Sequence, residues 1–289
     1  MAITFLLLSI AFSTFINLIF RWFKEYDVHK FQAIIVNYLV CFVLGISLSN
    51  NRNIFSYIGQ PWFTYCLLLG FLFIAIFFSM ALTTERLGIS VTAVSGKMSV
   101  VIPILFAFFY AKEEITILFV LGVVLSILSI YFITVKKELK IDKRFLVLPI
   151  IVFIGGGLID TSLKVLQTAY SEDVPLSAIS YSIFLGAFVA GVFIYLVKEK
   201  ANFSGWEWKS IKAGVGLGIP NYFSIFFLLS AIESFSVKSA FVFGVNNVGV
   251  VLLSTLLSVL IFKEKLEPKN QWGLLLAVVS IAIIAYASR

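Results

Sequence analysis

Ten long apolar stretches dominate this sequence and restrict its fold to one built inside a membrane. Each is about twenty residues long, the length that an α-helix needs to cross a bilayer. Their expected bounds, to within a few residues, are 3–22, 31–49, 62–82, 90–110, 116–134, 145–169, 177–197, 211–231, 238–262 and 270–288. The stretches are continuously apolar rather than alternating, which favours helices over membrane β-strands. The sequence therefore predicts an all-α polytopic membrane protein with ten transmembrane helices.

Composition and motifs exclude several classes of function. The chain is 61% hydrophobic and only 13% charged, whereas a soluble domain is nearer a quarter charged. Its net charge of +7 lies in short loops that would face lipid headgroups, so we expect the lipid bilayer and no nucleic acid as a partner. No HExxH, Walker A, GxGxxG or GxSxG motif is present, and no Cys/His cluster. We therefore expect neither an enzyme nor a cofactor or metal site.

The two halves of the sequence match in a fixed order. A shift of 146 residues superposes Gly45 on Gly191 and Gly70 on Gly216, and a shift of 151 superposes Gly122 on Gly273. This pattern predicts a duplicated five-helix unit, with the first copy over residues 1–139 and the second over 140–289. Because five is odd, the second copy would enter the membrane upside down. Such inverted repeats are typical of secondary transporters.

Two stretches, 102–133 and 251–286, share one pattern, a long apolar helix, a turn with Lys-Glu and a glycine-bearing last helix. Glu113 and Glu264 occupy the turn, and Gly122 and Gly273 the last helix. In these features the chain resembles the EamA-like branch of the drug/metabolite transporter superfamily. The resemblance implies ten helices in two five-helix repeats and transport of a small solute. That family's substrates include amino acids, sugars, nucleotide derivatives, phosphorylated metabolites and drugs, so the resemblance does not choose among them.

The basic residues are distributed unevenly between the two sides of the membrane. Sixteen lysines and arginines fall in loops opposite the termini, and four, namely Arg52, Lys112, Lys238 and Arg289, fall on the side of the termini. Basic loops remain in the cytoplasm. We therefore expect both termini outside the cytoplasm, in a bacterial inner (plasma) membrane, although many relatives of this family are drawn with both termini inside.

Charged residues within an apolar stretch are the strongest candidates for a functional site. Asp160 and Lys164 lie inside 145–169, four residues apart and so on one helix face, where they can pair. A charge at the bilayer centre costs at least ~2.5 kcal/mol. The preceding Gly155, Gly156 and Gly157 allow another backbone to come close. We expect this helix to pack tightly at its glycine end and to turn its charges into a cavity, or else to hold them as a structural ion pair.

Further polar residues lie within other stretches. Lys97 either reaches the interface with its long side chain or binds an anionic group of a substrate. The shift of 151 residues superposes Ser95 and Gly96, which precede Lys97, on Asn246 and Asn247. The duplication therefore predicts polar residues at the same depth of the membrane in both copies. Asn37 and Asn221 are also intramembrane, where either an interhelical hydrogen bond or substrate contact would explain them. The candidate substrate-binding set is Lys97, Asp160, Lys164, Asn246, Asn247, Asn37 and Asn221.

These features together predict a secondary transporter of a small metabolite. If Lys97, Asp160 and Lys164 are all ionised, they leave one positive charge, which suits an anionic or zwitterionic solute such as an amino acid or organic acid. Without an ATP-binding motif, the driving force would be a coupling proton, a sodium ion or solute exchange. The alternative is a membrane-embedded scaffold without transport activity. The sequence does not specify the oligomeric state.

Overall fold

The computed structural model describes residues 1–26, 28–49, 54–87, 89–110, 116–134, 145–170, 173–198, 205–235, 239–263 and 267–287. Its regular elements in these ranges are helical. In chain order they are α1 (Ala2–Glu25), α2 (Lys30–Leu48), the 3-10 helix η1 (Ile54–Tyr57), α3 (Pro61–Leu87), α4 (Ile89–Met98), α5 (Val101–Phe109), α6 (Ile117–Thr134), α7 (Val147–Tyr170), α8 (Leu176–Lys198), α9 (Trp208–Ser234), α10 (Ser239–Phe262) and α11 (Pro268–Ala287).

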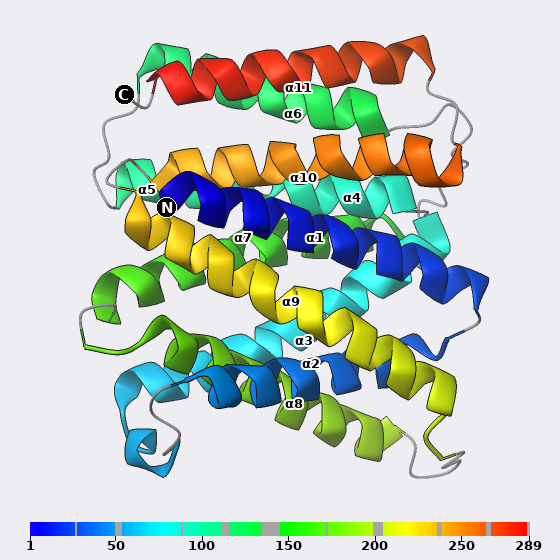
Figure 1. Ribbon diagram of the computed structural model, residues 1–289, viewed down its shortest axis with the longest axis vertical. Helices are drawn as coiled ribbons and strands as arrows, with labels where there is room; N and C mark the ends of the chain where they lie inside the picture. The colour runs from blue at the N-terminus through cyan, green and yellow to red at the C-terminus, as the bar shows by residue number, and fades with distance from the viewer. Residues whose placement is uncertain are drawn as a thin grey trace.

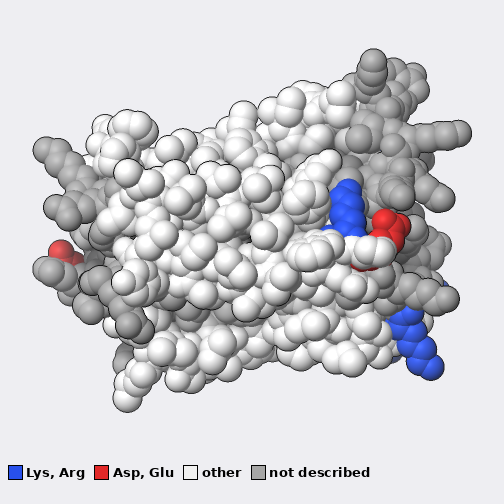
Figure 2. Space-filling view, turned by 90° about the horizontal axis from the view of Figure 1, so that it is seen from above, with Lys and Arg blue, Asp and Glu red and all other residues white. Residues whose placement is uncertain are grey.

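Seven of the described helices, α1, α2, α3, α7, α8, α9 and α10, contain a segment long and apolar enough to cross a membrane. Three shorter apolar segments cover 95–106, 117–132 and 268–284. Figure 2 shows a face with a broad uncharged belt, and its visible charged side chains lie toward the two ends. An uncharged belt between charged ends is what a bilayer requires of its protein surface. The chain is therefore a helical, polytopic membrane protein.

The helices run side by side in a stack (Figure 1). The pair α6–α11 forms one end of the stack, and α2 and α8 lie at the other end. Between these ends α9 packs against α1 and α2, while α3 packs against α7 and α8. α10 contacts α1, and α4 and α5 contact α7. α1 begins and α11 ends on the same side of the stack.

Glycines set the closest helix contacts. A Cβ built on Gly214 or Gly218 of α9 would lie 2.6 Å from the carbonyl oxygen of Ala33 or 2.8 Å from that of Asn37, both in α2. In α3, a Cβ on Gly70 would collide with the backbone of α8 at Ile183. Small residues let backbones approach in this way when lipid supplies no hydrophobic force between helices.

The glycine end of α7 also packs tightly, as the sequence predicts. A Cβ on Gly155 would collide with Ile76 of α3, and one on Gly157 with Ile102 of α5. A Cβ on Gly156 would lie 3.1 Å from the hydroxyl of Ser99. The three glycines thus bring α7 against α3, the turn between α4 and α5, and α5 just before Asp160.

One predicted span differs in the structure. The stretch 90–110 was expected to form a continuous helix, but the helix stops after Met98 and resumes at Val101. The Ser99 hydroxyl donates a 2.6 Å hydrogen bond to the carbonyl of Gly96, and the Val100 amide reaches only the Lys97 carbonyl, at 3.4 Å. A short i→i+3 turn therefore replaces the regular α-helical bonding at this point.

Candidate functional site

Lys97 and Asp160 are brought together by two different helices. Lys97 is the penultimate residue of α4, close to the middle of the segment from Ile89 to Phe109. Asp160 lies near the middle of α7. Both side chains are partly buried, and the two charges interact electrostatically. Because Lys97 is near the middle of the segment from Ile89 to Phe109 and Asp160 near the middle of α7, the interaction takes place well inside the span rather than at its surface.

The helix break lies directly beside this charge pair. It leaves the backbone around Lys97 without continuous α-helical hydrogen bonding, and Gly156, four residues before Asp160, faces it through Ser99. Interrupted helices near the membrane midplane supply free backbone groups to substrates and ions in many transporters. The charge pair and the break in α-helical hydrogen bonding therefore coincide at the α4–α7 contact.

A charge from another helix, Lys97, acts on Asp160. Lys164 lies one turn beyond Asp160 on α7, where the spacing allows the two to pair. Lys164 is buried, only 6% exposed, and has an interaction partner. The i,i+4 rule considers only neighbours on one helix, so it could not identify a partner from α4.

Asn246 belongs to a second polar group, formed by α1, α9 and α10. The hydroxyl of Ser9 lies 3.0 Å from Asn246 Oδ1 and 3.0 Å from the carbonyl oxygen of Ser224. Since a hydroxyl has one proton, Ser9 donates to one of these acceptors at a time. Asn247, in contrast, donates to the carbonyl of Phe243 in its own helix, at 3.1 Å. Asn246 therefore contacts α1, whereas Asn247 forms its hydrogen bond within α10.

Four phenylalanine rings adjoin this second group. Phe5 and Phe12 of α1 stack on Phe227 and Phe223 of α9, with centroid distances of 5.3–6.0 Å and interplanar angles of 19–29°. On α1, Phe5, Ser9 and Phe12 follow helical spacing and share one face. Ser9 therefore lies on the same face of α1 as two of the stacked rings.

Asn37 and Asn221 form a third polar group, where α2 meets α9. Asn221 Nδ2 donates to Asn37 Oδ1 at 3.0 Å. The Cys41 thiol, one turn further along α2, lies 3.9 Å from the same oxygen and donates to the carbonyl of Gly218 at 3.2 Å. These side chains hold α2 and α9 together with hydrogen bonds, in addition to the close glycine contact.

Three buried polar atoms at this contact have no hydrogen-bond partner in the part of the chain that the structure describes. They are Asn37 Nδ2 and the hydroxyls of Tyr38 and Tyr222. Both tyrosines are fully buried, and their rings flank Phe184 at 6.2 Å. A buried polar group without a partner costs about 1–3 kcal/mol.

Five of the seven candidate residues thus belong to three polar groups, and the second and third groups adjoin along α9, where the Ser224 hydroxyl donates to the Asn221 carbonyl at 2.9 Å. Lys97 and Asp160 form the first, Asn246 with Ser9 and Ser224 the second, and Asn37 with Asn221 and Cys41 the third. Sequence reasoning missed Ser9, Ser224, Tyr38 and Tyr222, because single hydroxyls within apolar stretches are common. It also missed Ser99, although the neighbouring Ser95 and Gly96 were a signal of helix weakness.

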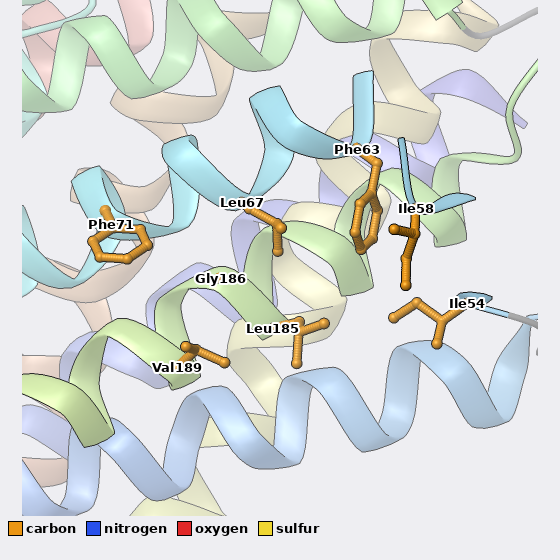
Figure 3. Close-up of a pocket in the computed structure, with 8 residues that line it drawn as sticks. All are labelled: Ile54, Ile58, Phe63, Leu67, Phe71, Leu185, Gly186 and Val189. Atoms are coloured by element: carbon orange, nitrogen blue, oxygen red, sulfur yellow. The ribbon is translucent and has the colours of Figure 1, made fainter. Parts of the chain in front are cut away.

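Two findings concern other kinds of site. Among the described residues, no three His, Cys, Asp or Glu side chains come together as metal ligands. A pocket of about 300 Å³ lies between α3 and α8, and its eight lining residues are apolar or glycine. Figure 3 shows the residues that line it. The pocket therefore lacks the charged groups that Lys97 and Asp160 provide at the α4–α7 contact.

Comparisons with known proteins support the fold without assigning a function. No protein-family model matches the chain. An uncharacterized protein of Haemophilus influenzae is 27% identical over 295 residues, covering 98% of both chains. One solved crystal structure is similar over 100% of this chain and 97% of its own, with a TM-score of 0.76 and 15% identity. At that identity, the similarity shows a shared fold only.

Proposed function

We propose that this protein is a secondary transporter that moves a small anionic or zwitterionic solute, such as an amino acid or organic acid, across the membrane. The observation that carries the proposal is the interaction of Lys97 with Asp160 beside the α4–α5 break. Two opposite charges from separate helices lie well inside a bundle where lipid cannot solvate them.

A solute could bind Lys97 and Asp160 by replacing the contact that the two residues make with each other. The ammonium of Lys97 would bind a substrate carboxylate, and Asp160 would bind a substrate amino group or a coupling proton or sodium ion. When the site is empty, the two residues neutralise each other, which limits the cost of burying them. Lys97 thus offers the site a group that binds an anion and Asp160 one that binds a cation, so a zwitterion, or an anion together with a coupling cation, fits both.

The arrangement of helices supports an inverted repeat of two five-helix units, 1–139 and 140–289. If α4 and α5 count as one crossing, exchanging the halves converts the α2–α9 contact into α8–α3, and α1–α9 into α7–α3. The same exchange leaves the α6–α11 and α2–α8 contacts in place. Ten crossings also agree with the two ends of the helical chain lying on one side.

Glycine packing supports the same relation at a finer scale. Gly70 of α3 approaches the carbonyl of Ile183, and Gly218 of α9 approaches that of Asn37. The sequence register paired Gly70 with Gly216, but Gly216 has no neighbouring atom within 4 Å of its built Cβ. We therefore pair Gly70 with Gly218 and Ile183 with Asn37.

This plan is that of the EamA-like branch of the drug/metabolite transporter superfamily, and we propose membership of it. Such a protein would reside in a bacterial inner membrane and use an ion gradient or exchange. The expected orientation, with both termini outside the cytoplasm, follows from the loop charges; Glu113 and Glu264, and the terminal-side residues Arg52, Lys112, Lys238 and Arg289, lie outside the described residues.

A ligand screen on purified protein tests the proposal. A bound solute stabilises the folded state by mass action, by about 2.7 kcal/mol at one hundred times its Kd. An amino acid or organic acid should raise the melting temperature of the wild type and of the exposed-lysine control Lys209→Ala, but not that of Lys97→Ala. A scaffold without transport activity would show no such solute, or equal shifts in all three proteins.

A further inference from the structure

A polar pair, Asn17 and Ser254, links α1 to α10 within the membrane-spanning segments of these two helices. Asn17 Nδ2 donates a hydrogen bond of 3.1 Å to Ser254 Oγ. Asn17 is exposed and Ser254 is half-buried. Asn17 has no second partner among the residues that the structure describes, so its Oδ1 acceptor and one N–H are unused there.

Ser254 lies on the inward face of α10. Asn247, seven residues or two turns earlier, shares this face and is buried, as is Val250, one turn earlier. Leu256, two residues after Ser254, lies about 200° around the helix and is 49% exposed. Because α10 contains a membrane-spanning segment, the side of Leu256 meets lipid and the side of Ser254 meets the bundle.

Asn17 lies on the face of α1 that packs against α10. Ile10, seven residues earlier, is buried on this face, and a Cβ built on Gly249 of α10 would lie 2.6 Å from its Cδ1. Phe15, two residues before Asn17, lies on the opposite side and is 52% exposed. The two helices separate toward their C-terminal ends (Figure 1). The contact is therefore close at Ile10, while the exposed carboxamide of Asn17 borders open space inside the bundle.

Lys97 lies at the same level of the bundle as this pair. α1 and α10 end, and α4 begins, on one side of the stack (Figure 1). Asn17 and Ser254 come eight residues before the ends of their helices, and Lys97 comes eight residues after the start of α4. Each residue is therefore ~12 Å from that side. α4 packs against α3, α6 and α7, whereas α1 packs against α9 and α10, so Lys97 and Asn17 approach this level from different groups of helices.

We propose that Asn17 and Ser254 bind a hydrogen-bond donor of the transported solute, a hydroxyl or amino group, while Lys97 binds its anionic group. This assignment rests on the proposed transport function, and it narrows the substrate to an acid that also carries such a donor. Asn17 Oδ1 accepts from the solute, and the Ser254 hydroxyl, which accepts from Asn17, retains a proton to donate. Polar side chains within membrane spans typically face the bundle interior or a water-filled cavity.

Access of water to the pair is tested with introduced cysteines in proteoliposomes. A sulfonated maleimide on both sides of the bilayer modifies thiols that meet water but not those that meet lipid, because the reactive thiolate forms in water. The wild type, whose two cysteines are buried, gives the background. Asn17→Cys and Ser254→Cys should react several-fold faster than Phe15→Cys and Leu256→Cys. Rates no higher than those of these lipid-facing controls would overturn the proposal, and Ser254→Cys alone decides it if Asn17→Cys does not fold.

Contact with the solute is tested with acids that differ at one carbon. L-alanine, L-lactate and propionate carry an amino group, a hydroxyl or a hydrogen there, and L-phenylalanine, L-phenyllactate and 3-phenylpropionate repeat the series with a larger side chain. In at least one series, the amino or hydroxy acid should raise the melting temperature of the wild type more than the unsubstituted acid. Asn17→Ala should weaken binding of that acid about two- to tenfold, the worth of one hydrogen bond, and leave the unsubstituted acid unaffected.

Failure of this assignment and failure of the transport proposal give different results. Equal affinity of the wild type and Asn17→Ala for the stabilising acid would overturn the assignment and leave transport in place. No preference for the substituted acids in the wild type would overturn it as well. Absence of any stabilising amino or organic acid would contradict the proposed function and the solute contact together, whereas fast modification of Asn17→Cys would still show the open space.

Discussion

At the residue scale, the structure separates polar side chains that hold helices together from those that lack partners. The carboxamides of Asn37 and Asn221 bond to each other, while the adjacent phenols of Tyr38 and Tyr222 have no partner among the described residues. In the proposed second half, Tyr38 corresponds to Phe184 through the same shift that relates Asn37 to Ile183. The polar side chains that α2 contributes to its contact with α9 are therefore replaced by apolar ones in α8, at the α8–α3 contact that we propose to correspond to it.

Removing an unpartnered hydroxyl should not destabilise the protein. We predict that Tyr38→Phe or Tyr222→Phe raises the free energy of unfolding by up to about 1 kcal/mol, because each removes a buried polar group without breaking a hydrogen bond. Tyr195→Phe is the matched control, since its hydroxyl bonds Gln32 Nε2 at 3.0 Å, and it should lower stability by about 1 kcal/mol. Denaturant unfolding in detergent measures both, and a loss of more than 1 kcal/mol in Tyr38→Phe would contradict this account.

At the scale of elements, the closest helix contacts depend on glycines whose neighbours are backbone. A backbone carbonyl cannot rotate away as a flexible side chain can, so an added methyl group must push the two helices apart. Within α9 this applies to Gly218, which faces α2, but not to Gly216, which is exposed. One helix therefore offers both a sensitive glycine and its control.

We predict that Gly218→Ala destabilises the protein by about 1–3 kcal/mol, the usual cost of overpacking. Gly216→Ala should have little effect or stabilise slightly, since alanine is the better helix former. Melting temperatures of the two variants in one detergent provide the comparison. Equal effects at both positions would show that α2 and α9 are not in close backbone contact.

The positions of the helices could be predicted from the sequence more fully than the contacts between them. Apart from 90–110, which forms α4 and α5, each apolar stretch coincides with one helix to within about five residues, because lipid-spanning length is a property of the local sequence. The break at Ser99 and the Lys97–Asp160 interaction were not predicted. The first depends on a side-chain hydrogen bond to Gly96, and the second on the packing of α4 against α7, which residue spacing does not encode.

At the scale of the whole molecule, the proposed transport would depend on the pattern of helix contacts. In the proposed inverted repeat, contacts that exchange between the two halves would open on either side of the membrane in turn. The distribution of basic residues in the loops predicts the orientation of the chain in the membrane. Sixteen basic residues on one side against four on the other predict that the termini face away from the cytoplasm.

A fusion tests this orientation directly. We predict that a reporter enzyme active only in the cytoplasm is silent when attached after Arg289, while a reporter active only outside the cytoplasm functions there. Insertion of the cytoplasmic reporter between residues 137 and 143, in the most basic loop, should restore its activity. Strong activity of the cytoplasmic reporter at the C-terminus would show that the termini face the cytoplasm and would contradict the predicted orientation, but not the fold.

Uptake of a radiolabelled solute into proteoliposomes is the most direct test of the central claim, with the solute chosen as the amino acid or organic acid that stabilises the purified protein. The account predicts uptake by the wild type and by Lys209→Ala, loss of most uptake in Lys97→Ala with normal protein yield, and an altered pH dependence in Asp160→Asn. Wild-type uptake and an unchanged pH profile in both Lys97→Ala and Asp160→Asn would contradict it and leave the charge pair a structural element.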